Sequence, residues 1–397
     1  MRKTLLAILL VAAVLILEVA FVHNYIVPRE HYIFDFVQRW YGARAMLIEH
    51  RNPYSPEVTK EIQIALVGYP LSPNGCQQGF LYPPFLAFTI PHFLLPYRLG
   101  LSVWIVTLQV LVVAAAWLIA RFTSRKVKIP IALLLPLALA AATFRYSLLN
   151  LGYAQFSIPV LFWTVVVWWL WNKGQFLLAG IALTQVASKP QLALVLIPFW
   201  LLLAMVRRRW QLIAGFSAAL AMLLTLPFLF AGNWIPEFVT GLTQAVHTCQ
   251  TPIYTEPSAL IRLGVSLVLS VGLLILTLRS PRGRQGYRLG MLLSLGTTVT
   301  LFGTPFIHNY DLVLALLPLV YGIVSLREFR GKAARLLEAA FWAAVVILPW
   351  LLRALVPAYE VESPERWLFP AIVLGLIAGL AAIQINQAGA SSAPTPD

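Results

Sequence analysis

Long apolar runs with almost no charge constrain this chain more than any other feature of its sequence. Examples are residues 5–20, 102–120, 129–142 and 192–206. A helix of about 20 such residues, rising ~1.5 Å per residue, crosses the ~30 Å hydrocarbon core of a bilayer. Of the 397 residues, 60% are hydrophobic and 11% are charged, whereas soluble domains average about half and about a quarter. The sequence therefore predicts an all-α polytopic membrane protein.

The basic residues gather in short loops between these apolar runs. A net charge of +14 would indicate a nucleic-acid partner in a soluble protein. Here the charge instead follows the positive-inside rule, which places basic loops in the cytoplasm. No nucleic acid is therefore expected as a partner. The four clusters are Arg121/Arg125/Lys126/Lys128, Arg207/Arg208/Arg209, Arg279/Arg282/Arg284/Arg288 and Arg327/Arg330/Lys332/Arg335.

One proline-rich segment decides the sidedness of everything that follows it. Residues 80–99 are apolar but contain four prolines between Pro83 and Pro96. Prolines inside a helix remove hydrogen bonds that lipid cannot replace. If this segment crossed the membrane, the basic cluster at 121–128 would face outward. We therefore expect it to be interfacial or re-entrant, which puts all four basic clusters inside.

The sequence then predicts about twelve transmembrane helices, with both termini in the cytoplasm. The expected location is the plasma (inner) membrane of a prokaryote. Residues 1–386 form one transmembrane domain, 24–100 form a long first external loop with juxtamembrane helices, and 387–397 form a disordered tail. The predicted spans are 4–23, 101–120, 129–148, 156–172, 175–188, 190–206, 211–231, 259–278, 289–305, 310–326, 337–356 and 367–386.

The sequence contains only two cysteines and no recognisable metal-binding motif. Cys76 and Cys249 are too few for a disulfide framework. Both fall in segments predicted to lie outside, so one disulfide and two unpaired thiols are both compatible with the sequence. No HExxH motif or clustered Cys/His spacing is present. We expect no cofactor, and a divalent cation at Asp35 stays open.

Asp35 is one of only three aspartates, and it lies among aromatics about a dozen residues beyond the first span. A carboxylate in such surroundings can act as a general base on a hydroxyl. A structural role is the alternative, either as a helix N-cap or in an ion pair with Arg39, four residues on.

Lys189 is the second anomaly, because the sequence SKPQ interrupts an apolar stretch between two spans. A charge there is costly and usually functional. Pro190 breaks the helix, which leaves the ammonium able to hold an anion such as a phosphate. The alternative is a lysine that extends its charge to the interface at a tight turn.

Two further turns carry polar side chains on the predicted outer face. LNLGYAQF contains Asn150 and Gln155, and an ordinary polar loop is the alternative there. TPFIHNYDL offers histidine and aspartate for acid–base or metal chemistry, but a lone loop histidine is more often without such a role. The residues of the second turn are His308, Asn309, Tyr310 and Asp311, and the weaker candidates elsewhere are Glu18, His247, Tyr254 and Glu256.

Five segments, in this order and spacing, resemble glycosyltransferase family 87, the polyprenyl-phosphate-mannose-dependent mannosyltransferase-like enzymes of the GT-C superfamily. They are DFVQRWYGARAMLIEHRNPYSPE, LYPPFLAFTIPHFLLP, NLGYAQFSIPVLF, GIALTQVASKPQLALVLIP and TPFIHNYDLVLALLP. The resemblance covers roughly residues 1–330. It implies a GT-C membrane fold, a lipid-phosphate sugar donor and a catalytic aspartate in the first outside loop.

Carried over to this chain, the resemblance makes Asp35 the catalytic aspartate. It also implies donor or phosphate binding by Lys189 and Gln155. Further candidates for donor or phosphate binding are Arg39, Arg44 and Asn150, and candidates for substrate binding are His308, Tyr310, Asp311 and Tyr82. The last motif often has a tryptophan followed by histidine in the mannosyltransferase branch. This chain departs from that pattern, which leaves the sugar and the role of the histidine open.

The function that follows is transfer of mannose, or another hexose or pentose, from a polyprenyl-phosphate donor to a glycolipid or glycan hydroxyl on the non-cytoplasmic face. One base without a second carboxylate nucleophile favours inversion. The alternative is a lipid-linked sugar flippase, with Lys189, Asp311 and Glu18 lining a pathway. Transporters often show paired broken helices, whereas the irregularity here is confined to one early segment, which favours the enzyme. Membrane lipids are further partners.

Overall fold

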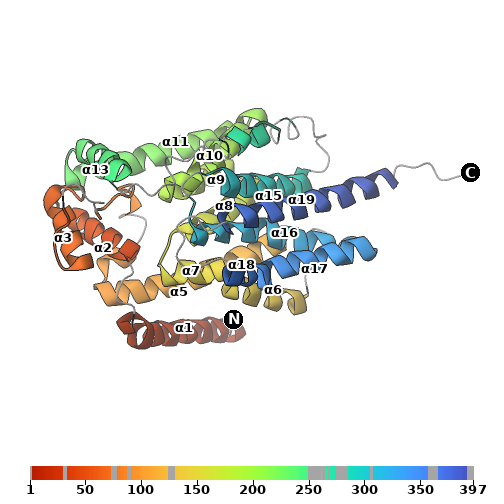
Figure 1. Ribbon diagram of the computed structural model, residues 1–397, viewed down its shortest axis with the longest axis horizontal. Helices are drawn as coiled ribbons and strands as arrows, with labels where there is room; N and C mark the ends of the chain where they lie inside the picture. Colours follow the sequence, from red (N-terminus) through yellow and green to blue (C-terminus); the bar gives the residue numbers. More distant parts are fainter. Residues whose placement is uncertain are drawn as a thin grey trace, which may run out of the picture. The chain divides into compact units, whose positions relative to one another are not determined.

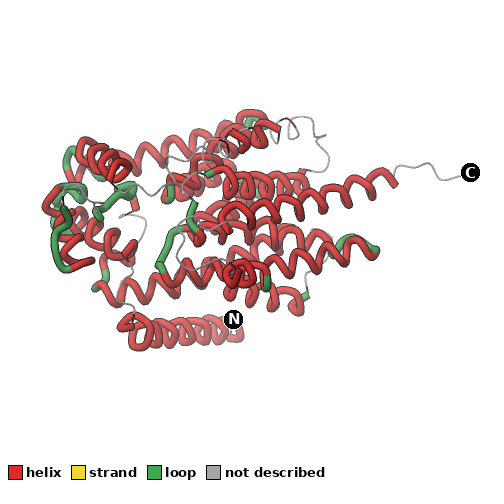
Figure 2. Tube along the Cα trace, in the orientation of Figure 1, coloured by secondary structure: helices red, strands yellow, loops and turns green. Residues whose placement is uncertain are grey.

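The computed structural model describes residues 2–29, 34–72, 78–86, 91–123, 130–248, 285–304, 307–355 and 365–390, with a few positions between 261 and 275 (Figure 1). Within these residues every regular element is a helix, as Figure 2 shows. The chain forms two compact units. Unit 1 comprises Met1–Leu111, Asn150–Phe156 and Ala218–Thr251, and unit 2 comprises Val112–Leu149, Ser157–Ser217 and Pro252–Asp397.

Unit 1 combines one helix whose surface suits a lipid environment with several short, more polar helices. Its first helix exposes apolar side chains all round, such as Leu6 at 68% and Leu10 at 65%, as a helix surrounded by lipid does. The next two α-helices pack side by side (Figure 1). The elements are α1 (Arg2–Phe21), η1 (Val22–Ile26), η2 (Val27–Arg29), α2 (Phe34–Leu47), α3 (Pro56–Val67), η3 (Pro91–Leu94), the first part of α5 (Tyr97–Thr123), α12 (Phe228–Ala231) and α13 (Ile235–Thr248).

The bounds of α3 follow from local sequence chemistry. Ser55 is the N-cap, and its Oγ accepts a hydrogen bond from the Val58 amide at 3.3 Å. Pro56 occupies the first turn, where its missing N–H costs nothing. Gly68 ends the helix in the left-handed region, with φ of 84°. The helix thus starts and stops where the sequence SPEVTKEIQIALVG requires.

An aromatic core holds the polar part of unit 1 together. The Tyr54 ring lies 5.4 Å from the Phe80 ring and 5.0 Å from the Phe238 ring of α13, measured between centroids. Gly42 of α2 faces Phe80 so closely that a Cβ there would come within 2.4 Å of the ring. Glycine is therefore required for α2 to approach the segment that contains Phe80.

Unit 2 is a bundle built around helices that are apolar on every side. All residues of α16 are buried, and α16 packs against α15, α17 and α19. A helix that is apolar all round belongs in the centre of a bundle. The elements are α6 (Ile131–Thr143), the start of α7 (Arg145–Gly152), α8 (Ser157–Asn172), α9 (Phe176–Leu183), η4 (Thr184–Ser188), α10 (Pro190–Val206), the start of α11 (Trp210–Thr225), α15 (Gln285–Gly303), η7 (Asn309–Ala315), α16 (Leu316–Leu326), α17 (Lys332–Val346), α18 (Leu348–Leu355) and α19 (Glu365–Ala390).

Glycines bring α9 and α11 into backbone contact. A Cβ at Gly180 would lie 2.0 Å from the carbonyl oxygen of Leu212, and one at Gly215 would lie 2.3 Å from that of Leu177. The two contacts are reciprocal, so each helix uses one glycine to admit the other. Small residues at helix crossings are typical of membrane proteins, where close van der Waals packing replaces the hydrophobic effect.

The described helices confirm a polytopic membrane protein. Five are long and apolar enough to cross a bilayer, or up to seven if the bent pairs α6–α7 (50°) and α17–α18 (54°) each count as one span. Shorter apolar helices occupy the predicted spans at 156–172, 175–188, 190–206 and 289–305. The total of twelve, the sidedness and the GT-C fold stay predictions.

Three predicted segments can be compared only in part. The span at 259–278 lies largely outside the described residues. In 80–99, the described residues before α5 form turns and the short η3, with no helix long enough to cross. At the C-terminus α19 continues to Ala390, four residues into the segment expected to be disordered.

Replacing Gly180 with alanine should destabilise unit 2. The added Cβ would clash with the Leu212 carbonyl, and overpacking typically costs about 1–3 kcal/mol. Thermal unfolding of the purified protein in detergent measures the effect. The matched control is Gly375→Ala in α19, where nothing lies within 4 Å of the new Cβ. Equal melting temperatures for the two variants would contradict the close approach.

Candidate active site

Asp35 lies in the first turn of α2, and its carboxylate is held by two neutral donors in unit 1. The Tyr82 hydroxyl donates to Oδ1 at 2.6 Å, and the Gln155 side-chain amide donates to Oδ2. The Asp35 side chain is half-buried. A carboxylate has about four lone-pair sites. Two are used, so the oriented group can accept a further hydrogen bond from a substrate hydroxyl.

Tyr82 is held through its backbone carbonyl, and its hydroxyl stays protonated. Its backbone carbonyl accepts a hydrogen bond from the Tyr54 hydroxyl at 2.6 Å. Burial raises the pKa of the Tyr82 phenol well above its usual value. Tyr82 therefore stays protonated over the physiological range and acts as a donor to Asp35.

Gln155 is presented by a strained turn. Ala154 has φ of 47°, a left-handed conformation that is uncommon for a residue with a Cβ. The Trp104 indole donates to the Ala154 carbonyl at 3.0 Å, and the Gln155 amide donates to the Asn150 carbonyl at 2.8 Å. These two bonds hold the turn. Asn150 thus supports Gln155 through its backbone.

Arg39 lies one helical turn after Asp35, and its guanidinium is buried between two aromatic rings. The Arg39 side chain is only 2% exposed, and its guanidinium carbon lies 4.0 Å from the ring centroids of both Tyr82 and Phe156. Its Nε and Nη1 have no hydrogen-bond partner among the described residues. The ion pair with Asp35 considered from the sequence is absent from the ion pairs of this part of the chain.

Cation–π contacts alone do not satisfy a buried guanidinium. Each is worth about 0.5–2 kcal/mol, whereas a buried charge without hydrogen bonds costs considerably more. The Nε and Nη1 groups of Arg39 therefore lack hydrogen bonds of the kind that a bound anion could supply. Arg44, by contrast, lies nine residues after Asp35, stacks on Trp40 at 4.7 Å and reaches the Leu94 carbonyl at 3.5 Å. It is not part of the cluster around Asp35.

Unit 2 holds a second cluster, centred on Lys189 at the junction of η4 and α10. The Lys189 ammonium donates to Asp311 Oδ1 and, at 2.9 Å, to the Ser157 hydroxyl, which itself donates to the same carboxylate oxygen at 2.6 Å. Lys189 is 5% exposed, and Asp311 and Ser157 are fully buried. This ammonium is therefore neutralised inside the protein rather than extended to an interface.

The turn before α16 completes this second cluster. The His308 amide donates to the other oxygen of Asp311 at 2.9 Å, so Asp311 also caps η7. The Tyr310 ring centroid lies 4.3 Å from the Lys189 ammonium and 5.0 Å from the His308 ring. The structure thus brings together Lys189, His308, Tyr310 and Asp311, which the sequence predicts only as separate candidates.

Two residues of these clusters and one further buried ion pair are not predicted from the sequence. Phe156 and Ser157 look like ordinary members of an apolar run, and no local pattern distinguishes them. Arg145 and Glu365 form a buried ion pair in unit 2, with side chains 8% and 1% exposed. Arg145 carries the same signal as Lys189, a lone charge next to an apolar stretch, and could have been found by it.

No group of three or more His, Cys, Asp or Glu side chains that could hold a metal occurs among the described residues. Several predicted candidates cannot be placed. Cys76, Cys249, Tyr254 and Glu256 lie outside the described residues, as does the side chain of His247. The disulfide therefore stays a prediction.

Comparison with models of protein families matches this chain to a known family. The model of glycosyltransferase family 87 matches residues 80–305, which is more than half of the chain. The match includes Tyr82, Gln155 and Lys189, whereas Asp35 and Asp311 lie outside the matched residues. No curated protein and no solved structure matches.

Breaking the buried pair in unit 2 should destabilise the protein far more than breaking an exposed pair. Lys189→Met or Asp311→Leu alone leaves one buried charge unpaired, which costs about 3–5 kcal/mol, whereas the double variant should recover most of this loss. Thermal unfolding in detergent measures both.

The matched control for this comparison is Arg51→Met, which breaks the exposed pairs with Glu49 and Glu61 in unit 1. Exposed pairs contribute about 0–1 kcal/mol. Single variants of Lys189 and Asp311 that unfold no earlier than this control would show that the buried pair is not structural.

Proposed function

Since this chain belongs to glycosyltransferase family 87, we propose that it transfers a sugar from a polyprenyl-phosphate donor to a glycolipid or glycan hydroxyl on the non-cytoplasmic face of the membrane. The family and the apolar helices make the chain a membrane-embedded glycosyltransferase. One observation carries the proposed reaction. Asp35, held by Tyr82 and Gln155, lies one turn before Arg39, whose Nε and Nη1 have no hydrogen-bond partner in the described part of the chain.

In the proposed reaction Asp35 is the general base. It takes the proton of the acceptor hydroxyl while that oxygen forms a bond to the anomeric carbon of the donor sugar. The bond from the anomeric carbon to the phosphate oxygen breaks, and its electron pair leaves with the polyprenyl phosphate. Tyr82 and Gln155 orient the carboxylate, and neither can serve as a second carboxylate nucleophile. Direct displacement with inversion therefore fits this cluster.

The departing phosphate requires a cation, and we assign this role to Arg39. The resemblance implies Lys189 instead, but the Lys189 ammonium is already bound to Asp311 and Ser157. The Nε and Nη1 of Arg39 have no hydrogen-bond partner among the described residues. A guanidinium also suits bidentate binding of phosphate oxygens. Lys189 then serves mainly to hold unit 2 together. The sugar is mannose or another hexose or pentose, and His308 and Tyr310 stay proposed substrate contacts.

Asp35→Asn should abolish sugar transfer while the protein remains folded. The amide keeps the shape but cannot accept the proton, and loss of a general base costs about 10²–10⁴-fold in rate. Transfer is measured with purified protein in detergent and a polyprenyl-phosphate-mannose donor. Such turnover needs no compartments, which distinguishes the enzyme from a flippase.

The matched control for Asp35→Asn is Glu57→Gln, which removes an exposed carboxylate from α3 of the same unit. It should retain full activity. Substantial turnover by Asp35→Asn would remove Asp35 from the mechanism.

Arg39→Lys should lower kcat/KM for the donor by about 10- to 100-fold. The ammonium keeps the charge but loses the planar set of donors, and a hydrogen bond to a charged group contributes about 1.5–3 kcal/mol. Initial rates against donor concentration give the value. Arg51→Lys is the control, because the Arg51 guanidinium is already matched by Glu49 and Glu61. If the two variants have the same donor kinetics, Arg39 does not bind the phosphate.

A further inference from the structure

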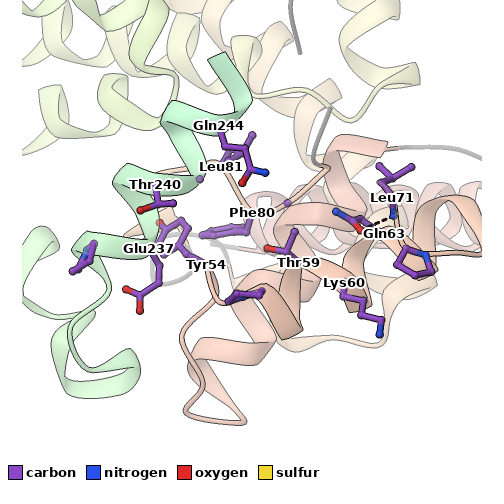
Figure 3. A pocket seen from close by; sticks show the side chains of 15 residues that line it. Tyr54, Thr59, Lys60, Gln63, Leu71, Phe80, Leu81, Glu237, Thr240 and Gln244 are labelled. Carbon is purple, nitrogen blue, oxygen red and sulfur yellow. Dashed lines mark hydrogen bonds between the residues drawn. The ribbon is translucent and has the colours of Figure 1, made fainter. Parts of the chain in front are cut away.

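Unit 1 contains a cavity of about 500 Å³ between α3 and α13. Figure 3 shows side chains of α3 on one side, side chains of α13 on the other, and Phe80 between them. Cavities of about 300–1,000 Å³ are the usual size of small-molecule sites. All of its lining residues belong to unit 1, the unit that also contains Asp35.

The lining of this cavity combines hydrogen-bonding side chains with aromatic surface. Thr59 comes from α3, and Thr240 and Gln244 come from α13. Gln63 of α3 also lines the cavity, and its Oε1 already accepts a hydrogen bond from the Leu71 amide at 2.8 Å. Hydroxyl and amide groups both donate and accept hydrogen bonds, which suits a ligand whose own groups are hydroxyls. Tyr54 and Phe80 form the aromatic part of the lining and are tightly packed, with only 7% and 1% of each residue exposed.

The charge of the cavity argues against an anionic ligand. One ammonium, from Lys60, and one carboxylate, from Glu237, are the charged groups in its lining. A phosphate site would carry an excess of cations, and a site for a lipid chain would lack this number of polar groups. A neutral, hydroxyl-rich ligand matches both observations.

Glu237 provides a second and independent indication of a ligand. Its Oε2 is buried and has no hydrogen-bond partner among the residues that the structure describes. A buried carboxylate oxygen without a donor is costly. A sugar hydroxyl bound in the cavity would supply the missing hydrogen bond once the Glu237 side chain turns toward it.

The cavity is connected to the catalytic carboxylate through a short segment of chain. Phe80 and Leu81 line the cavity, and the next residue, Tyr82, donates to Asp35. Tyr54, also in the lining, donates to the Tyr82 carbonyl. A ligand that displaced Phe80 or Tyr54 would therefore also move the donor that orients Asp35.

We infer that this cavity binds the saccharide portion of the acceptor, in the form of a short chain of neutral sugars. The inference rests on the proposed function and deepens it, because it separates an acceptor subsite between α3 and α13 from the phosphate contact at Arg39. It also makes Glu237 an acceptor-binding residue rather than a catalytic one.

Gly241 offers a direct way to fill the cavity. It lies on α13 and belongs to the lining, and a Cβ there would be 3.6 Å from Leu81 Cδ2, an ordinary contact. A phenylalanine at this position would occupy cavity space. Thr243, two residues further along the same helix, is exposed and absent from the lining, so Thr243→Phe is the matched control.

The test is saturation-transfer NMR on the full chain in detergent with mannotriose, maltotriose and xylotriose. Wild type and Thr243→Phe should both show saturation transfer to at least one trisaccharide, and Gly241→Phe should lose it. Glu237→Gln should weaken binding about tenfold, as expected for loss of a hydrogen bond to a charged group. Absence of signal in wild type, or equal signals from Gly241→Phe and Thr243→Phe, would overturn the inference.

The same samples separate this inference from the proposed function. Asp35→Asn should bind the trisaccharide as wild type does but not glycosylate it. Binding that depends on Gly241, in a wild-type protein that transfers no sugar, would support the cavity and reject the transferase mechanism. Transfer without such binding would support the mechanism and reject the cavity.

Discussion

A charge removed from water needs a partner, and the buried charged side chains of this chain differ in whether they have one. In unit 2, Lys189 is matched by Asp311, and Arg145 is matched by Glu365. In unit 1, Arg39 is as deeply buried but has two nitrogens without a hydrogen-bond partner among the described residues. Matched pairs of this kind hold helices in register, whereas an unmatched guanidinium is maintained at a cost in stability and is therefore the stronger indication of a ligand.

This distinction changes how Lys189 and Arg39 are interpreted. Both are candidate donor-site cations in the sequence, and nothing local shows which one is satisfied. The partner of Lys189 is 122 residues away, in a turn whose own polar residues favour a functional interpretation. Only the folded chain shows that Asp311 neutralises the lysine, and this is why we assign the phosphate to Arg39.

Much of the fold could be predicted because the bilayer imposes strong rules on sequence. Apolar runs give the helices of unit 2, Ser55 and Gly68 set the ends of α3, and Pro190 marks the break beside Lys189. What could not be predicted is long-range pairing. Gln155 reaches Asp35 across 120 residues, and the reciprocal approach through Gly180 and Gly215 depends on a helix crossing that no single segment encodes.

Tyr82 shows why the candidate site is more than its most obvious residue. Its hydroxyl orients Asp35, its ring covers Arg39, and its carbonyl is held by Tyr54 from the cavity lining. One side chain thus contacts the proposed base, the proposed phosphate ligand and a residue of the proposed acceptor subsite. A ligand that moves the Tyr82 backbone therefore also moves the donor to Asp35 and the ring that covers Arg39. Because the segment around Tyr82 is rich in proline and cannot form a regular helix, its position depends on these contacts, and occupancy of the cavity should be coupled to the orientation of the carboxylate.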